Sequence, residues 1–302
     1  MLHLPTQNSN LVSKPQEYVV GAWVLAGGRC PKPLRIALRL MAGISWSLAC
    51  YLAIRTVHLL TLGAVERRKH WSKRLSRRWV SVMRGLLGIR LYGEGKAPEH
   101  PYFLVVNHHT WAEYFGINVI LNARLVVMAE DGDFPIVGIL TRGLDPIFSD
   151  RTRENVPTVN RELIESIQRR ESVMIAPEGA VTPGHMIRRY RAALLEAAVA
   201  TETPVHYACV HWRTPEGCLA PSEAIIYGPD MFVRDAAGNI AASEIELWGP
   251  ERPMLPHLMR LLSLPHCDLI YRFGPAPIMG RDRINLANAL HAASLDIFTP
   301  SA

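Results

Sequence analysis

The segment that decides the fold lies at residues 102–113 and reads YFLVVNHHTWAE. Its first five residues are aromatic or aliphatic, which predicts a buried strand, and the polar residues after Val106 lead into an apolar stretch of helical character. Open α/β sheets bind their ligands at the carboxyl ends of their strands. The segment therefore predicts a strand-to-helix corner with a functional histidine, His108, at the corner.

Short runs rich in β-branched and aromatic residues surround this segment, with helical stretches between several of them. They are residues 89–92, 125–128, 146–148, 173–176, 205–212, 224–227 and 269–273. Strands that alternate with helices predict an α/β domain, here with a mixed, largely buried sheet flanked by helices. The prolines and glycines of residues 228–256 predict long loops and no domain boundary.

The composition is that of a globular protein in a reducing compartment. The chain has 302 residues, of which 49% are hydrophobic, so a sizeable core is expected. Its five cysteines are scattered and odd in number, which argues against both a disulfide framework and a thiolate zinc site.

The amino-terminal third divides into a loose leader at residues 1–33 and predicted membrane-associating helices at residues 34–88, before a catalytic domain at residues 89–302. Residues 40–54 are uncharged and mostly apolar. A perpendicular span needs about 20 apolar residues, so this run is short unless it continues to Leu62. A spanning helix, a half-inserted helix and a buried core helix all remain open.

Residues 66–90 form a basic segment with nine lysines and arginines against one acid. Apolar residues recur in it at three- and four-residue steps: Trp71, Leu75, Trp79, Val82 and Leu86. This pattern predicts a basic amphipathic helix, which suits either the headgroup layer of an anionic leaflet or an ordinary solvated face. No nucleic-acid-binding signature accompanies it, so nucleic acid is not an expected partner.

His108 and Glu113 are candidates for a catalytic pair. Five residues on one helix correspond to a rotation of about 140°, but a corner between them can return the carboxylate to the imidazole. A carboxylate bonded to one ring nitrogen leaves the other free to accept a proton. The alternative is a capping box from Thr110 to Glu113, in which the carboxylate only bonds backbone. Both readings stay open, and metal binding by His108 and His109 is disfavoured because adjacent histidines rarely face one ion.

Two further segments place polar residues just after predicted strands. Arg151 ends the sequence IFSDR, and its planar guanidinium suits a phosphate or a carboxylate. Pro177, Glu178 and Gly179 end the sequence VMIAPEG, where the glycine lets backbone approach a ligand closely.

Together these blocks resemble the glycerolipid acyltransferase family, which includes 1-acylglycerol-3-phosphate acyltransferase. The resemblance rests on Asn107-His108-x-Thr110-x-x-Glu113, Ile147-Phe148-x-Asp150-Arg151, Pro177-Glu178-Gly179 and Thr203-Pro204-Val205, in that order. Phe134-Pro135-x-Val137-Gly138 also looks like the segment that precedes the family's arginine motif. The match runs from about Arg90 to Trp212.

The resemblance implies a glycerol-3-phosphate acyltransferase-like fold and transfer of a fatty acyl group from acyl-CoA or acyl carrier protein to a lysophospholipid hydroxyl, as in 1-acylglycerol-3-phosphate. His108 would deprotonate the hydroxyl, Glu113 would orient His108, and Arg151 would contact the acceptor's phosphate. The other implied substrate-site residues are Asn107, Thr110, Pro177, Glu178 and Gly179, with backbone N–H groups near Gly179 stabilising the oxyanion.

The resemblance also implies a setting for the enzyme. The expected partners are membrane lipids and the acyl donor, without a metal or redox cofactor. The expected place is the cytoplasmic face of a membrane, the inner membrane in a bacterium, with monotopic or single-span attachment.

Two departures from the family pattern keep other readings open. Glu113 stands where the family usually has aspartate, and Ala180-Val181 replaces its usual Thr-Arg, which removes a possible phosphate contact. The alternatives are a membrane-binding scaffold that has lost catalysis and a hydrolase of acyl thioesters.

Overall fold

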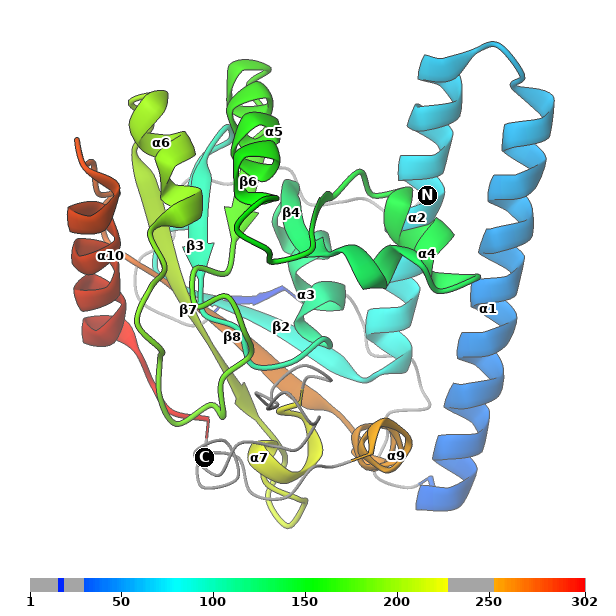
Figure 1. Cartoon of the computed structure of the whole chain (residues 1–302). Helices are drawn as coiled ribbons and strands as arrows, with labels where there is room; N and C mark the ends of the chain where they lie inside the picture. Colours follow the sequence, from blue (N-terminus) through cyan, green and yellow to red (C-terminus); the bar gives the residue numbers. More distant parts are fainter. Residues whose placement is uncertain (1–15, 19–29, 228–252, 302) are drawn as a thin grey trace, which may run out of the picture.

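A computed structural model describes residues 16–18, 30–227 and 253–301 (Figure 1). Within these residues eight strands form one sheet in the order β1-β2-β8-β7-β3-β6-β4-β5. The strands are β1 Gln16–Tyr18, β2 Ile89–Glu94, β3 Phe103–Val106, β4 Ala123–Met128, β5 Ile147–Ser149, β6 Ser172–Ile175, β7 Val205–Arg213 and β8 Cys267–Phe273. Strands β7, β3, β6, β4 and β5 are parallel neighbours, whereas β8 is antiparallel to β7. The predicted mixed α/β fold is confirmed.

Helices cover both faces of the sheet. They are α1 Lys32–Leu60, α2 Val65–Leu86, α3 Glu113–Ile120, α4 Val137–Arg142, α5 Val156–Gln168, α6 Glu196–Ala200, α7 Pro221–Ala224, α9 Met254–Ser263 and α10 Arg283–Ile297. Leu104 and Val106 of β3 lie in the core under α1, α2, α3 and α9, while Phe103 and Val105 lie in the core under α5, α6 and α10. Because side chains alternate along a strand, β3 is buried on both faces and reads as a continuous apolar run.

Most predicted strands are found within two or three residues of their expected ends, but the strand predicted at 224–227 is wrong. Helix α7 ends at Ala224, and Tyr227 forms only an isolated bridge with Thr110. Pro221 is the first residue of α7, and its fixed φ angle favours the start of a helix. Glu223 follows in the first turn. The loops predicted at 228–256 lie mostly outside the described residues, and their last part is wrong because α9 begins at Met254.

The predicted leader at residues 1–33 lies mostly outside the described residues. Its part at Gln16–Tyr18 forms the edge strand β1, antiparallel to β2, which the sequence did not predict.

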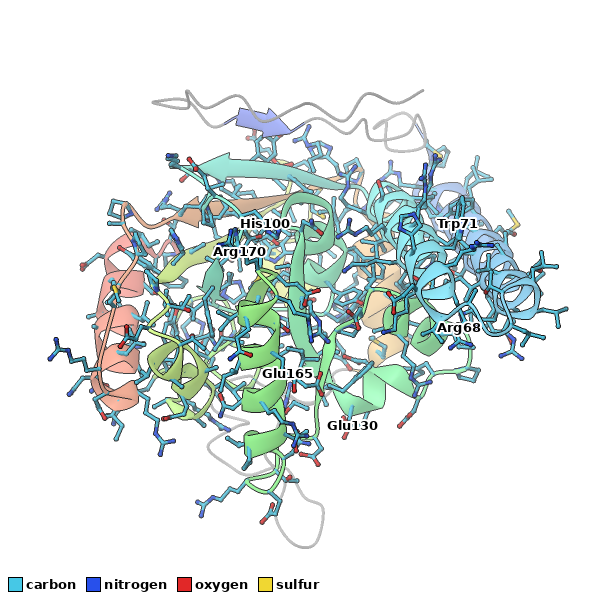
Figure 2. All side chains as sticks on the ribbon, turned by 90° about the horizontal axis from the view of Figure 1, so that it is seen from above. Arg68, Trp71, His100, Glu130, Glu165 and Arg170 are labelled. Atoms are coloured by element: carbon cyan, nitrogen blue, oxygen red, sulfur yellow. The ribbon has the colours of Figure 1, made fainter. Side chains whose placement is uncertain are left out.

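Helices α1 and α2 form a hairpin that stands on one side of the molecule, with α10 on the opposite side (Figures 1 and 2). In the described part of the chain, α1 is the one helix long and apolar enough to cross a membrane. It contains 29 residues and therefore extends well beyond the apolar run at 40–54. Large apolar side chains are exposed along it, namely Leu34, Met41, Ile44, Leu48, Leu52, Leu59 and Leu60.

The apolar stripe of α2 does not provide this exposed surface, in contrast to the headgroup-layer prediction. Trp79 and Leu86 are buried, and the ring of Trp79 packs edge-on against Phe115 of α3. Trp71, near the start of the helix, is 43% exposed. The buried part of the stripe therefore fixes α2 to the rest of the fold, and the outward apolar face belongs to α1.

Two buried arginines attach α1 to the carboxyl-terminal end of α9. The Arg39 guanidinium donates hydrogen bonds to the carbonyls of Leu262, Leu264 and Pro265 at 2.7–2.9 Å. Arg35 donates to the carbonyl of Ser263 at 2.6 Å. The last carbonyls of a helix lack partners within the helix and carry partial negative charge, so cations stabilise this end.

Replacing Arg39 by alanine should destabilise the fold. The Arg39→Ala variant leaves three carbonyls without their donor and is expected to lose about 2–4 kcal/mol of unfolding free energy. Denaturant unfolding of the full chain in detergent measures this loss. Arg55→Ala, an exposed arginine of the same helix, is the control and should change stability little; equal losses in both variants would contradict the role of Arg39.

Candidate active site

The predicted functional residues follow the carboxyl ends of neighbouring parallel strands. His108 comes after β3, Glu178 after β6 and Arg151 after β5; Asp131, which the sequence analysis did not single out, comes after β4. Because β3, β6, β4 and β5 are adjacent and parallel, these residues share one edge of the sheet. This is the edge at which open α/β sheets bind ligands.

A turn after β3 pairs His108 with Glu113. The chain leaves the strand at Val106, and α3 begins at Glu113, so the two residues lie on opposite sides of the predicted corner. The His108 Nδ1 atom lies 2.7 Å from Glu113 Oε2. The predicted pairing is confirmed as geometry, and the glutamate reaches the imidazole despite standing where the family usually has aspartate.

The ring orientation leaves the second nitrogen available. The His108 side chain is 30% exposed, and its Nε2 atom has no hydrogen-bond partner among the residues that the structure describes. A carboxylate acceptor at Nδ1 favours the tautomer with the proton on Nδ1. Nε2 can then accept a proton, as a general base must.

Glu113 is a buried carboxylate with donors on several sides. Its Oε1 accepts a hydrogen bond from Trp212 Nε1 at 3.0 Å, and both oxygens lie 3.2 Å from the His109 backbone nitrogen. Burial alone would raise the pKa of this carboxyl, but the bonds and charge of His108, with help from His109 and Trp212, outweigh it and lower the pKa. Glu113 thus stays ionised beside His108.

The capping-box alternative is not formed as predicted. The Glu113 carboxylate bonds the backbone of His109, whereas a capping box would have it bond the backbone of Thr110. The Thr110 hydroxyl lies 3.4 Å from the Ala112 nitrogen. The carboxylate therefore holds the turn and the imidazole together.

Glu178 holds the His108 backbone from the other side. Its two oxygens accept hydrogen bonds from the backbone N–H groups of His108 at 2.9 Å and Arg188 at 2.8 Å. The Thr182 N–H donates to the His108 carbonyl at 2.8 Å. Glu178 is 2% exposed, and burial raises its pKa to about 7. This geometry favours a positioning role for Glu178 over contact with a substrate.

Asn107 and Thr110, predicted at the substrate site, are buried on the inner side of the turn. The Asn107 amide exchanges two hydrogen bonds with the backbone of Val210 in β7 and donates to His109 Nε2 at 2.8 Å. Thr110 forms an isolated parallel β-bridge with Tyr227. The Tyr227 backbone N–H donates to the His109 carbonyl at 3.1 Å. Both residues tie the turn to its neighbours.

Gly179 lies next to the site in a conformation that requires glycine. Its φ is +72°, and an added Cβ would lie 3.0 Å from the Arg191 side chain. Its N–H donates to the Ala176 carbonyl at 3.2 Å, which contradicts an oxyanion role for that group. The Pro177 carbonyl accepts the Arg191 N–H at 2.8 Å, so Pro177 positions Arg191, and the missing side chain of Gly179 leaves room for the Arg191 side chain.

Charges of both signs surround Arg151 at this edge. Arg151 has a φ of +61° and lies within electrostatic reach of Glu130, Asp131 and Arg191. Burial raises the pKa of Asp131, while Arg151 and, more weakly, His108 lower it. The ligand edge is therefore not uniformly cationic, as a site for phosphate alone would be.

The sequence did not reveal the residues that support the pair. Trp212 lies near the end of β7 among other apolar residues. Arg188 acts through its backbone N–H, and Thr182 acts through its backbone N–H and through its hydroxyl, which donates to the His108 carbonyl at 3.1 Å. Only the strand order brings Trp212 to Glu113, 99 residues away.

Residues 88–210 match the family model described as Acyltransferase. Over this segment the chain is similar to acyltransferases. A lyso-ornithine lipid O-acyltransferase of Pseudomonas aeruginosa is 25% identical over 76% of this chain and 81% of its own. A 1-acyl-sn-glycerol-3-phosphate acyltransferase of Neisseria gonorrhoeae is 27% identical over 34% of this chain and 42% of its own.

A solved structure is also similar to this acyltransferase. The 1-acyl-sn-glycerophosphate acyltransferase PlsC of Thermotoga maritima matches with a TM-score of 0.49 and 14% identity, over 86% of this chain and 97% of that one. The matched family segment runs from just before β2 into β7, so it contains His108, Glu113, Arg151 and Glu178. The relatives are named as O-acyltransferases, so the protein is an enzyme of this kind.

The buried His109 should make the stability of the acyltransferase depend on pH. Burial lowers the pKa of His109 from 6.5 to about 4, so the unfolded chain takes up its proton first as the pH falls. The contribution of His109 to the free energy of unfolding has its full value above pH 6.5 and decreases between pH 6.5 and 4. At pH 5 it is lower by about 2 kcal/mol.

Unfolding free energies at pH 7 and pH 5 test this contribution in the His109→Gln variant. We expect the variant to lose less stability than the wild type between the two pH values, because glutamine cannot take up a proton. It should still lose some stability, because burial also lowers the pKa of His211, which both proteins contain. His70→Gln, at an exposed histidine of α2, should keep the wild-type dependence. An unchanged pH dependence in His109→Gln would show that His109 does not carry the effect.

Proposed function

We propose that this acyltransferase moves a fatty acyl group from a thioester to the hydroxyl of a lysolipid, with His108 as the general base. The observation that carries the proposal is the 2.7 Å contact between His108 Nδ1 and the buried Glu113, at the ligand edge of the sheet. Glu113 would stabilise the imidazolium that forms when Nε2 takes a proton.

In the proposed reaction the Nε2 atom of His108 removes the proton of the acceptor hydroxyl. The oxygen attacks the thioester carbonyl carbon, an ester bond forms, and the carbon–sulfur bond breaks. The imidazolium returns its proton to the leaving thiolate. Because the acceptor oxygen attacks the thioester directly, no covalent enzyme intermediate is needed. The absence of a Gly-x-Ser-x-Gly motif from the sequence agrees with this direct route. Acyl-CoA and acyl carrier protein are both candidate donors.

A lyso-ornithine lipid is the first candidate acceptor. The relatives named for it match about three quarters of this chain, whereas the lysophosphatidate relatives match about one third. Ornithine carries amine and carboxyl groups, and the ligand edge carries Arg151 beside Glu130 and Asp131. A phosphate monoester would gain nothing from the two acids. Lysophosphatidate remains the second candidate, on the similarity to the Neisseria enzyme.

The exposed face of α1 supports attachment to a membrane. Its inner face packs on α2 and α9 through Arg39, Gly43, Cys50 and Ile54, while its outer face presents large apolar residues. Because α1 lies along a basic helix that is packed onto the domain, we propose that α1 rests in the interfacial layer, on one side of the bilayer. Placement at the cytoplasmic face is part of this proposal.

Removing the imidazole of His108 should abolish most of the transfer. Membranes with wild type, His108→Ala or the exposed-residue control His70→Ala are incubated with labelled acyl-CoA or acyl carrier protein and each lysolipid. We expect His108→Ala to be slower by about 10²- to 10⁴-fold and His70→Ala to be unchanged. Equal activity of His108→Ala and wild type would refute the assignment of the base.

The same assay separates transfer from hydrolysis and ranks the acceptors. A transferase forms diacylated product only when a lysolipid is present, while a thioesterase releases free fatty acid without one. We expect more product from lyso-ornithine lipid than from lysophosphatidate. The reverse order would assign the acceptor to the phosphate class.

A further inference from the structure

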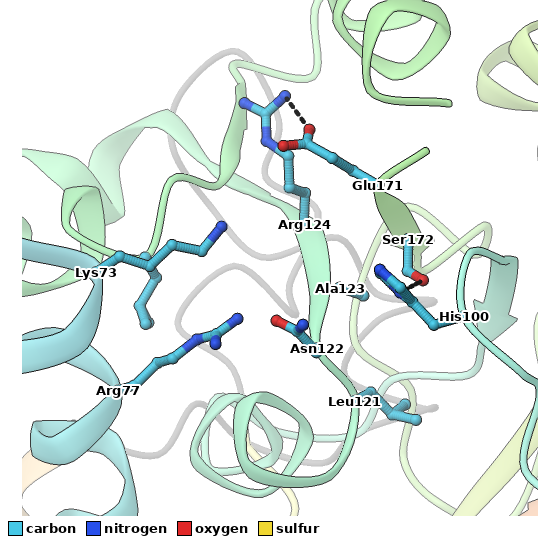
Figure 3. Close-up of a pocket in the computed structure, with 10 residues that line it drawn as sticks. Lys73, Arg77, His100, Leu121, Asn122, Ala123, Arg124, Glu171 and Ser172 are labelled. Carbon is cyan, nitrogen blue, oxygen red and sulfur yellow. Dashed lines mark hydrogen bonds and ion pairs between the residues drawn. The ribbon is translucent and has the colours of Figure 1, made fainter. Parts of the chain in front are cut away.

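A cavity of about 210 Å³ lies between α2 and the sheet, away from the active site. It is lined by ten residues: Lys73, Arg77, His100, Leu121, Asn122, Ala123, Arg124, Leu144, Glu171 and Ser172 (Figure 3). Its volume could hold several water molecules, at about 30 Å³ each. It is thus large enough for a small polyatomic ion.

The cavity lies at the edge of the sheet opposite to His108. Ala123 is the first residue of β4, Ser172 is the first residue of β6, and His100 precedes β3. His108 follows the other end of β3. A ligand here would therefore be separate from the acyl-transfer site.

Two cations of α2 point into the cavity from one side, as Figure 3 shows for Lys73 and Arg77. They are four residues apart and so lie on one face of the helix. Neither has an ion pair or hydrogen bond in the part of the chain that the structure describes. Lys73 is partly buried and Arg77 is exposed. Partial desolvation lowers the pKa of both groups; for Lys73 the charge of Arg77 adds to this effect, while Asp145 and Glu171 oppose it.

The third cation near the cavity, Arg124, already has hydrogen bonds and ion pairs within the protein. Its Nε donates to the Asp145 carbonyl at 2.9 Å and its Nη1 to Ser166 Oγ at 2.6 Å. The carboxylates of Asp145, Glu162 and Glu171 lie 3.5–3.9 Å from its guanidinium. Glu171 also pairs with Arg169 at 3.4 Å. These acids therefore form their ion pairs with Arg124 and Arg169. Asp145 and Glu171 also act on Lys73 through space, but no ion pair joins them to Lys73 or Arg77 among the described residues.

The opposite wall offers neutral polar groups. Asn122 has an exposed amide that faces Arg77 across the cavity in Figure 3. His100 Nδ1 bonds Ser172 Oγ at the far end. The Glu171 carboxylate also lines the cavity, 3.9 Å from the Arg124 guanidinium. Two cations on one side, facing neutral polar groups and an acid that is paired with Arg124, suit a compact anion with several oxygens, which can accept bonds from more than one direction.

We propose that this cavity binds a phosphate group, held by Lys73 and Arg77. A phosphate would replace like-charge repulsion along α2 with two charge-assisted contacts. Because α2 packs beside α1, the phosphate of an anionic lipid headgroup and free phosphate from solution are both possible sources. The site is independent of the acyl acceptor and of the proposed role of His108.

The test compares two double variants of the full chain in detergent. Lys73→Gln with Arg77→Gln removes the cavity cations, and Arg74→Gln with Arg78→Gln removes the same charge from exposed positions with the same spacing on the same helix. Binding of inorganic phosphate is measured by calorimetry. We expect at least tenfold weaker binding in the cavity variant and wild-type binding in the control.

A second arm identifies the source of the phosphate. Binding to phosphatidylcholine vesicles with and without phosphatidylglycerol is compared for the same proteins. A larger loss for the cavity variant than for the control on anionic vesicles assigns a lipid headgroup. A difference with inorganic phosphate alone assigns a soluble phosphate.

Equal effects of the two double variants in both arms would overturn the proposal. Thermal unfolding without phosphate separates binding from folding. The cavity variant should keep close to wild-type stability, because it loses the repulsion between Lys73 and Arg77 together with the attraction of Lys73 to Asp145 and Glu171. A clear destabilisation would instead make the two cations structural.

Discussion

The turn after β3 depends on one buried carboxylate. Glu113 accepts hydrogen bonds from the His108 imidazole, the Trp212 indole and the His109 backbone, so it connects α3, β7 and the turn at one point. A buried ionised group is stable only when its acceptor positions are filled. The same requirement fixes the direction of the imidazole. Catalytic geometry and local folding are therefore set by one set of contacts, and Glu178 completes it by holding the His108 backbone.

Sequence reasoning was reliable where a local pattern determines the structure. The continuous apolar run at β3 predicted a strand buried on both faces, and the turn that follows it brought His108 and Glu113 together as expected. It failed where a long-range contact decides. Residues 224–227 have strand-like composition, yet Pro221 starts a helix there and leaves Tyr227 to bridge Thr110. Trp212 could not be linked to Glu113 without knowing that β7 lies beside β3.

The amino-terminal helices show that an amphipathic pattern is compatible with contact to lipid and with contact to protein. The periodic apolar residues of α2 suggested contact with lipid, but Trp79 and Leu86 pack on the domain. An amphipathic pattern indicates that one face of a helix is shielded from water, but it does not indicate whether protein or lipid covers that face. In α1 the buried arginines are informative, because Arg35 and Arg39 bond to the end of α9, while large apolar side chains are exposed along the same helix.

The bonds of Arg39 attach α1 directly to the end of α9, without a linker between α1 and the rest of the fold. A protein anchored through a flexible linker samples many heights above a bilayer. Here, with α1 resting in the interface as proposed, the height and tilt of the ligand edge are fixed. The search for an acceptor then becomes a two-dimensional one, in which a lipid meets the imidazole by lateral diffusion at a constant depth. The structure of the anchor thereby limits how far along a lipid molecule the reacting hydroxyl can lie.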